Sequence, residues 1–188
     1  MSRLIYKQID TIEAQIEAQI EVSIDPYVCL DVSIDGLPSS NSTYYWRLID
    51  PAFNVISFRV DSELGYILSI VISLYNGRFE ETPQDGVHLR KEIPTTKGVP
   101  RFSQTGFSYV SNNDYIPARC DVVGRSRIFL SGLDMRVQLF PQEEDAFEVQ
   151  LSNDLSFLFN SSKQLIAVLV SGLSDEDRAS LHEFQRQV

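Results

Sequence analysis

Two stretches of the chain each read as a strand, a polar turn and a second strand. VISFRVDSELGYILSIVISL occupies residues 55–74, and DLSFLFNSSKQLIAVLVSGL occupies residues 154–173, 99 positions later. Aligned without gaps, the two stretches share six identical residues. Apolar runs on both sides of a short polar turn are typical of a β-hairpin. The sequence therefore predicts the same hairpin twice, and this constrains the fold more than any other feature.

Alternating apolar and polar residues extend the likeness upstream of each hairpin. The alternation is clear in residues 28–35 and again in residues 135–139, and each half then has a middle strand, at 44–49 and 147–151. Such alternation places one face of a strand in the core and the other in water, as in antiparallel sheets. We therefore predict an α+β fold, mainly β, with two tandem antiparallel β-meanders of about four strands each.

The length of the chain fits one domain made from these two units. Its 188 residues lie within the usual size of a single domain. We predict one domain, 1–188, in which similar halves at about 19–77 and 128–188 are joined by a turn-rich insertion at 78–127. Each small sheet would have an apolar face that the other could cover. Duplication of one unit and chance similarity between two hairpins both explain the pattern.

Helices are expected at the two ends of the chain. Ser174 can cap a helix whose first turn is acidic, so residues 175–187 are predicted to be helical. Near the N-terminus, IEAQIEAQIEVSID fits both a helical period and strict alternation. Glu, Ala and Gln favour helices over strands, which indicates a helix over residues 7–18 and a strand from Gln19.

Few residues suggest catalytic or metal chemistry. His88 and His182 are the two histidines, and neither lies near a second metal ligand in the sequence. Cys29 and Cys120 are too isolated for a disulfide framework and are predicted to be buried thiols. Neither a nucleophile elbow nor a glycine-rich phosphate loop occurs. We therefore predict no catalytic residues, no metal site and no cofactor.

Charge narrows the classes of partner. The formal net charge is −10, and residues 1–77 and 128–188 are both acidic, whereas residues 78–127 carry slightly more basic than acidic side chains. Acidic flanks disfavour nucleic acid and anionic membranes and favour a basic partner if the partner is charged, whereas solubility alone also explains the net charge. Aromatic and basic residues are interleaved at 101–115, which suits base stacking but also an amphipathic hairpin. The sequence shows neither a long apolar run nor a signal-like start, which predicts a cytoplasmic location.

The chain resembles bacterial immunity proteins in its small size and acidic flanks. Its two copies, ISFRVDSELGYILSIVI and LSFLFNSSKQLIAVLVSGLS, are similar to segments of such proteins. Immunity proteins lie in the cytoplasm and neutralise a cognate toxin domain, often a basic nuclease. The resemblance implies a non-catalytic protein that binds one toxin by surface acids and exposed aromatic residues and inhibits it by occlusion. Acidic groups would speed the encounter, and desolvated aromatic residues would supply most of the affinity.

Candidate partner-binding residues lie in the insertion and at the start of the C-terminal helix, because long irregular segments commonly carry binding sites. They are Glu80, Glu81, Asp85, Phe102, Phe107, Tyr109, Asp175 and Asp177. An alternative function is a self-associating assembly subunit, whose repeated hairpins would expose edges to neighbouring chains. An enzyme with a polar pocket that local motifs do not reveal is a third possibility.

Overall fold

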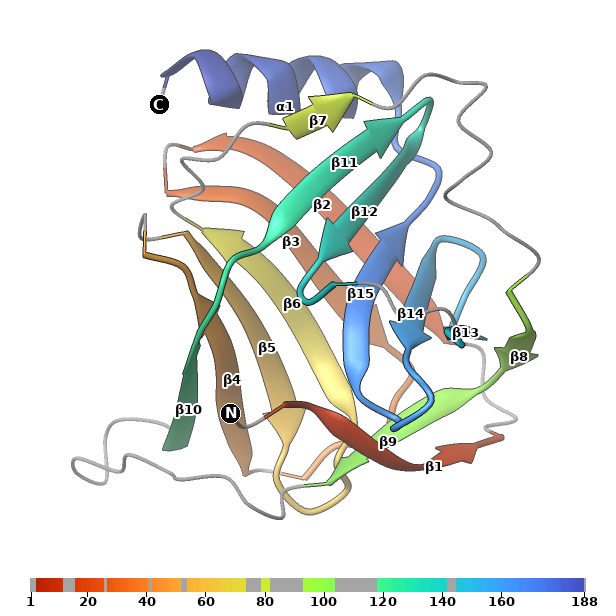
Figure 1. Ribbon diagram of the computed structural model, residues 1–188. Coiled ribbons are helices and arrows are strands. Elements are labelled where there is room, and N and C mark those ends of the chain that lie inside the picture. Colours follow the sequence, from red (N-terminus) through yellow and green to blue (C-terminus); the bar gives the residue numbers. More distant parts are fainter. Residues whose placement is uncertain are drawn as a thin grey trace.

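The described part of the chain forms two main sheets, a two-stranded ribbon and one helix (Figure 1). The computed structural model describes residues 3–11, 16–25, 27–40, 42–51, 54–73, 79–81, 93–103, 118–141 and 145–187. The protein is thus mainly β with a helix at its C-terminal end, as predicted.

The first sheet comes mostly from the N-terminal half. Its strands are β2 (Glu17–Asp25), β3 (Val28–Asp35), β4 (Thr43–Ile49), β5 (Val55–Asp61), β6 (Ile67–Ser73) and β10 (Ala118–Val123). Across the sheet they lie in the order β10-β4-β5-β6-β3-β2. Neighbouring strands are antiparallel except for β10, which runs parallel to β4.

The second sheet comes mostly from the C-terminal half. Its strands are β7 (Phe79–Glu81), β8 (Thr95–Lys97), β11 (Arg127–Ser131), β12 (Asp134–Gln138), β13 (Phe147–Gln150), β14 (Leu155–Phe159) and β15 (Leu165–Val170). Their order is β7-β11-β12-β15-β14-β13-β8. The short strands β7 and β8 run parallel to their neighbours, and the other pairs are antiparallel.

Both halves share one strand order. The series β4-β5-β6-β3-β2 in the first sheet corresponds strand for strand to β13-β14-β15-β12-β11 in the second. Three consecutive strands form a meander in each half, but the strand before them lies beside the last of the three, which gives a Greek-key order. This differs from the predicted four-stranded meander. The alternation of apolar and polar residues determines which face of a strand is buried, but it does not determine which strand lies beside it in the sheet.

The two sheets share one hydrophobic core, which contains buried residues from almost every strand. Trp46 on β4 is fully buried, with its ring centroid 5.5 Å from that of Phe58 in the same sheet. It also lies 6.4 Å from the ring centroid of Phe140, which follows β12 in the other sheet. Burial of each such side chain stabilises the fold by about 1.5–3 kcal/mol. The core therefore joins the two halves.

A two-stranded antiparallel ribbon, β1 (Ile5–Asp10) with β9 (Val99–Ser103), closes the end of the molecule opposite the helix (Figure 1). Each ribbon strand binds the turn of one repeated hairpin. The N–H of Tyr6 donates to the carbonyl oxygen of Lys163 (3.1 Å), and the N–H of Phe102 donates to that of Gly65 (2.8 Å). Tyr6 and Phe102 face each other in the ribbon. The ribbon therefore ties both hairpins together.

The predicted N-terminal helix is wrong where the structure describes it. Residues 7–10 belong to β1, and residues 17–18 belong to β2. Residues 12–15 lie outside the described residues. Pairing of β1 with β9 and of β2 with β3 supplies backbone hydrogen bonds along whole strands. These tertiary contacts outweigh the helix propensity of Glu, Ala and Gln.

The C-terminal helix α1 (Asp175–Gln187) begins and ends where the sequence predicts. The N–H of Asp177 donates to Ser174 Oγ (3.0 Å), and the N–H of Ser174 donates to Asp177 Oδ2 (2.9 Å). This reciprocal pair is a capping box. Leu181 and Phe184 are fully buried, and the helix packs against β2.

The two hairpin turns are held by equivalent side chains. Asp61 ends β5 and is fully buried, and its carboxylate accepts hydrogen bonds from the N–H groups of Glu63 (2.9 Å), Leu64 (2.7 Å) and Ser40. Burial alone would raise the pKa of Asp61, but these hydrogen bonds outweigh it and hold the pKa below its usual value. Asn160, 99 residues later, accepts from the N–H of Gln164 (2.9 Å) in the same way.

We expect Asp61→Ala to lower the free energy of unfolding by about 1–3 kcal/mol, because it leaves buried N–H groups without an acceptor. Asp61→Asn should lower the free energy of unfolding by less, since an asparagine side chain accepts the backbone hydrogen bond in the other turn. Chemical denaturation at neutral pH measures both. Equal losses in the two variants would contradict the assigned role of the side-chain oxygen.

The lowered pKa of Asp61 also predicts a dependence on pH. A carboxyl whose pKa is lower in the folded state stabilises the fold at pH values above its unfolded-state pKa of about 3.9. This stabilisation is lost as the pH falls further, through the pKa of the folded state. The stability of the wild type should therefore fall more steeply than that of Asp61→Asn as the pH decreases from about 5 towards the pKa of the folded state. Denaturant midpoints measured across this range test the prediction.

Gly65 and Gly132 form a matched pair for testing the contact between the ribbon and the hairpin. Both have positive φ angles, 78° and 59°. A Cβ on Gly65 would lie 2.6 Å from the carbonyl oxygen of Phe102, whereas a Cβ on Gly132 would meet nothing within 4 Å. Gly132→Ala should cost about 1–2 kcal/mol through backbone strain. Gly65→Ala should cost about 1–3 kcal/mol more through overpacking, as measured by denaturation.

Candidate functional site

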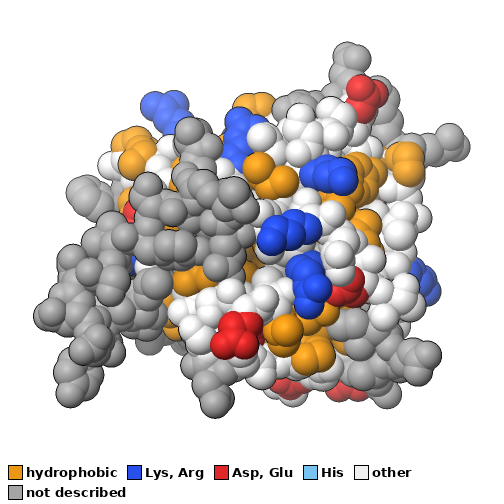
Figure 2. Space-filling model, turned by 90° about the horizontal axis from the view of Figure 1, so that it is seen from below, with side chains coloured by type: hydrophobic (Ala, Val, Ile, Leu, Met, Phe, Trp, Pro, Cys, Tyr) orange, Lys and Arg blue, Asp and Glu red, His pale blue; other side chains and the backbone are white. Residues whose placement is uncertain are grey.

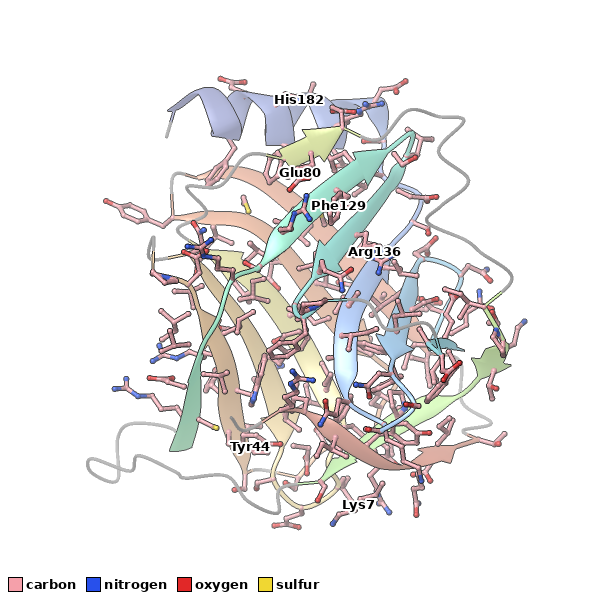
Figure 3. The ribbon with its side chains drawn as sticks, viewed as in Figure 1. Lys7, Tyr44, Glu80, Phe129, Arg136 and His182 are labelled. Carbon is pink, nitrogen blue, oxygen red and sulfur yellow. The ribbon has the colours of Figure 1, made fainter. Side chains whose placement is uncertain are left out.

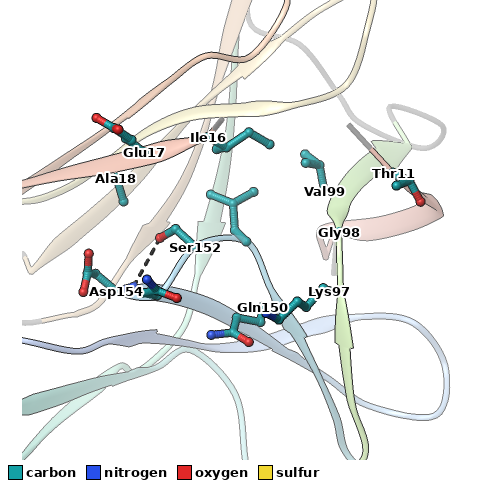
Figure 4. A pocket seen from close by; sticks show the side chains of 12 residues that line it. Thr11, Ile16, Glu17, Ala18, Lys97, Gly98, Val99, Gln150, Ser152 and Asp154 are labelled. Carbon is teal, nitrogen blue, oxygen red and sulfur yellow. Dashed lines mark hydrogen bonds between the residues drawn. The ribbon is translucent and has the colours of Figure 1, made fainter. Parts of the chain in front are cut away.

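A cleft of about 550 Å³ lies where the two sheets and the ribbon meet. It is bordered by the start of β2, the turn between β8 and β9, and the turn between β13 and β14 (Figure 4). Its volume is in the range typical of ligand sites. The lining residues are Thr11, Ile16, Glu17, Ala18, Lys97, Gly98, Val99, Gln150, Leu151, Ser152, Asn153 and Asp154.

Apolar side chains line part of the cleft. Ile16, Val99 and Leu151 belong to it, and Val99 is buried against Tyr66 and Leu68 in a small cluster separate from the main core. Ile16 and Leu151 are partly buried and pack against the same cluster. A ligand that covered the exposed parts of Ile16 and Leu151 would remove apolar surface from water, which is favourable.

Two tight backbone arrangements shape the walls of the cleft. In the turn after β13, the N–H groups of Leu151 and Ser152 both donate to the carbonyl oxygen of Leu155, at 3.0 and 3.2 Å. On the other side, the N–H of Gly98 donates to the carbonyl oxygen of Gln150 (3.1 Å). A Cβ on Gly98 would collide with the side chain of Ile9, so only glycine fits there.

Charged side chains stand at opposite sides of the cleft. Glu17 and Asp154 lie on one side, and Lys97 lies on the other (Figure 4). Lys97 and Asp154 are exposed, and within the described ranges neither side chain forms an ion pair. The cleft thus combines an apolar middle with a cation at one side and carboxylates at the other.

Glu80 and Glu81, two predicted partner-binding residues, lie on β7 and form ion pairs within the chain. Figure 3 shows the position of Glu80. Arg127 donates to Glu80 through Nε (2.6 Å) and a second nitrogen, and this pairing lowers the pKa of Glu80. Glu81 accepts a hydrogen bond from Arg178 (2.7 Å) and lies 3.2 Å from His182 Nε2 on α1. Both acids therefore link β7 to other elements, and their charges are partly matched already.

Phe102, a further predicted contact residue, is in the core. Only 2% of it is exposed, and its ring centroid lies 6.5 Å from that of Phe157 and 6.0 Å from that of Phe159. The prediction of an exposed aromatic residue at this position is wrong. From Pro100 to Ser103 on β9, buried and half-buried residues alternate, and Phe102 is one of the buried ones.

The other predicted residues are divided between α1 and undescribed segments. Asp177 forms the capping box of α1, and Asp175 is exposed in the first turn of that helix. Helix capping therefore explains an acidic residue at position 177 without invoking a partner protein. Asp85, Phe107 and Tyr109 lie outside the described residues. Of the predicted residues that the structure describes, none lines the cleft.

A second polar group lies beside the ribbon, at the end of the molecule that Figure 2 shows from below. Tyr66 Oη donates to Asp10 Oδ2 (2.7 Å), and this hydrogen bond lowers the pKa of Asp10. Arg101 Nε donates to the carbonyl oxygen of Leu64 (2.7 Å) and lies 3.7 Å from the same carboxylate. These contacts hold β1 and β9 against the β5–β6 hairpin, so their role is structural.

Other chemical features are limited. Both cysteines are buried thiols outside any disulfide, as predicted, and burial raises the pKa of the Cys29 thiol to about 12. In the described part of the chain, His, Cys, Asp and Glu side chains do not gather in threes that could hold a metal ion. Among the same residues, no helix combines the length and apolar character needed to cross a membrane.

Sequence reasoning missed the cleft because its residues come from segments far apart in the chain. Lys97 is the last residue of the short strand β8, Asp154 directly precedes β14, and neither belongs to a motif. The polar turn after β13 is visible in the sequence, but its neighbours across the cleft are set only by the pairing of β8 with β13. No protein-family model matches the chain, and no curated protein is significantly similar to it in sequence.

Proposed function

We propose that the protein is a non-catalytic binding module, and that the cleft receives an extended segment of a partner protein. The observation that carries this proposal is the position of the cleft. It is bordered by β2 and β8, which are the terminal strands of their sheets in the described part of the chain.

Terminal strands suit the binding of an extended segment. Each presents a row of backbone N–H and C=O groups directed away from its sheet, and an added strand can pair with such a row. Backbone pairing supplies affinity, and side-chain pockets supply specificity. At the cleft, Glu17 and Ala18 belong to β2 and Lys97 belongs to β8, so a bound segment would lie between two such rows.

Neutralisation of a toxin domain, which the resemblance to immunity proteins implies, is the biological form that we propose for this binding. A basic partner agrees with the net charge of −10. A toxin segment seated in the cleft would position the rest of the protein over the toxin surface. Inhibition would then follow from occlusion, with no reaction carried out by this chain.

We expect Ser152→Trp to reduce partner capture by about tenfold or more, because the indole would fill the cleft and a loss of about 1.4 kcal/mol already gives that factor. Ser161→Trp is the matched control, since Ser161 is an exposed serine in the turn after β14 and does not line the cleft. Capture from native lysate on immobilised protein, quantified by mass spectrometry, compares the two variants with the wild type.

Both variants should show the unfolding transition of the wild type by circular dichroism, so that loss of capture reports on the cleft. Equal capture by Ser152→Trp and the wild type would place the site elsewhere. Recovery of further copies of the chain instead of a partner would favour the assembly-subunit alternative.

A further inference from the structure

We infer that the segment bound in the cleft carries a basic and an acidic side chain on either side of apolar residues. The basic group would meet Asp154, and the acidic group would meet Lys97. This inference rests on the proposed function, because it gives the chemistry of the segment that the cleft receives.

The first argument is the separation of charge across the cleft. Lys97 stands on the side opposite Asp154 and Glu17 (Figure 4). Lys97 and Asp154 are exposed, and they belong to no ion pair within the described part of the chain. Some other acids differ from these, because Glu80 and Asp121 are paired with arginines. The two cleft charges therefore remain available to a ligand.

The second argument is the apolar surface of the cleft. Ile16 and Leu151, both half-buried, line the cleft together with the charged residues. A ligand with charges only would leave this surface wet, and a wholly apolar ligand would form no ion pair with the exposed Lys97 and Asp154. A segment with charged ends and an apolar middle satisfies both kinds of surface.

The energies of the two contributions are unequal. Exposed ion pairs contribute little, so each charge match should change affinity by only about two- to fivefold at low salt. Burial of apolar side chains supplies most of the affinity, and the charges fix which end of the segment lies where. The charge pattern thus acts mainly on specificity and register.

Capped tetrapeptides test the inference on the intact protein. The probes are acetyl-Lys-Leu-Leu-Gln-amide, acetyl-Gln-Leu-Leu-Glu-amide and the neutral acetyl-Gln-Leu-Leu-Gln-amide. Dissociation constants come from calorimetry, and the binding site comes from backbone amide shifts in NMR spectra. Each singly charged peptide should bind about two- to fivefold more tightly than the neutral one at low salt, and 0.5 M salt should remove the difference.

Isosteric variants assign each charge to its partner. Asp154→Asn should remove the preference for the Lys peptide and leave the preference for the Glu peptide. Lys97→Gln should do the reverse. Lys163→Gln is the control, because Lys163 is an exposed lysine outside the cleft and should change neither preference. These variants alter exposed side chains, so their folding should match that of the wild type.

Equal binding of the charged and neutral peptides would overturn the inferred charge pattern, and so would shifts confined to residues outside the cleft. The proposed function can fail separately, because it depends on whether Ser152→Trp loses the natural partner. Loss of that partner together with charge-independent peptide binding would leave the cleft as the site of an uncharged segment. Retention of the partner would reject the cleft for the natural ligand whatever the peptides do.

Discussion

The fold depends on the contact between two apolar sheet faces, neither of which could remain in water. Each half supplies five strands in the same order, and one face of each sheet is lined by buried aliphatic and aromatic side chains. Trp46, Phe58 and Phe140 join these faces in a single core. A small sheet with one apolar face is not stable alone, so the second half acts as the cover of the first. The strands β7, β8 and β10 then pair with the edges of this sandwich, and β1 and β9 form the separate ribbon.

The ribbon shows how deeply the likeness between the halves extends. An antiparallel pair is related to itself by a two-fold rotation, so its two strands can make the same contact with two different hairpins. Tyr6 and Phe102 each donate a backbone hydrogen bond to one hairpin turn. Asp61 and Asn160, which are 99 positions apart in the sequence, each accept backbone hydrogen bonds within one of these turns. Chance similarity would explain two alike hairpins. A shared five-strand order with shared turn chemistry favours duplication of one unit.

Local patterns predicted those elements whose partners lie close in the sequence. The hairpins and the C-terminal helix follow from alternation, polar turns and the cap at Ser174. The ribbon, the edge strands and the cleft depend on pairings between distant segments, such as β9 with β1, which no local pattern encodes. The predicted site had the same weakness. Glu80 and Glu81 look like free surface acids, but their arginine partners lie 47 and 97 residues away.

The cleft lies where the likeness between the halves ends. Gly124 follows β10 and donates its N–H to the carbonyl oxygen of Ile49 at the end of β4, as Gly98 does to Gln150 at the end of β13. After Gly124 the chain crosses to β11 in the other sheet, whereas after Gly98 it enters the ribbon. Asn54 in the first half is only 3% exposed, whereas Asn153, which lies 99 residues later in the turn after β13, is exposed. In a duplicated fold, a position that packing closes in one half and leaves open in the other is free to acquire a ligand. This asymmetry favours the cleft over the shared core and the ion-paired surface as the site of the proposed binding.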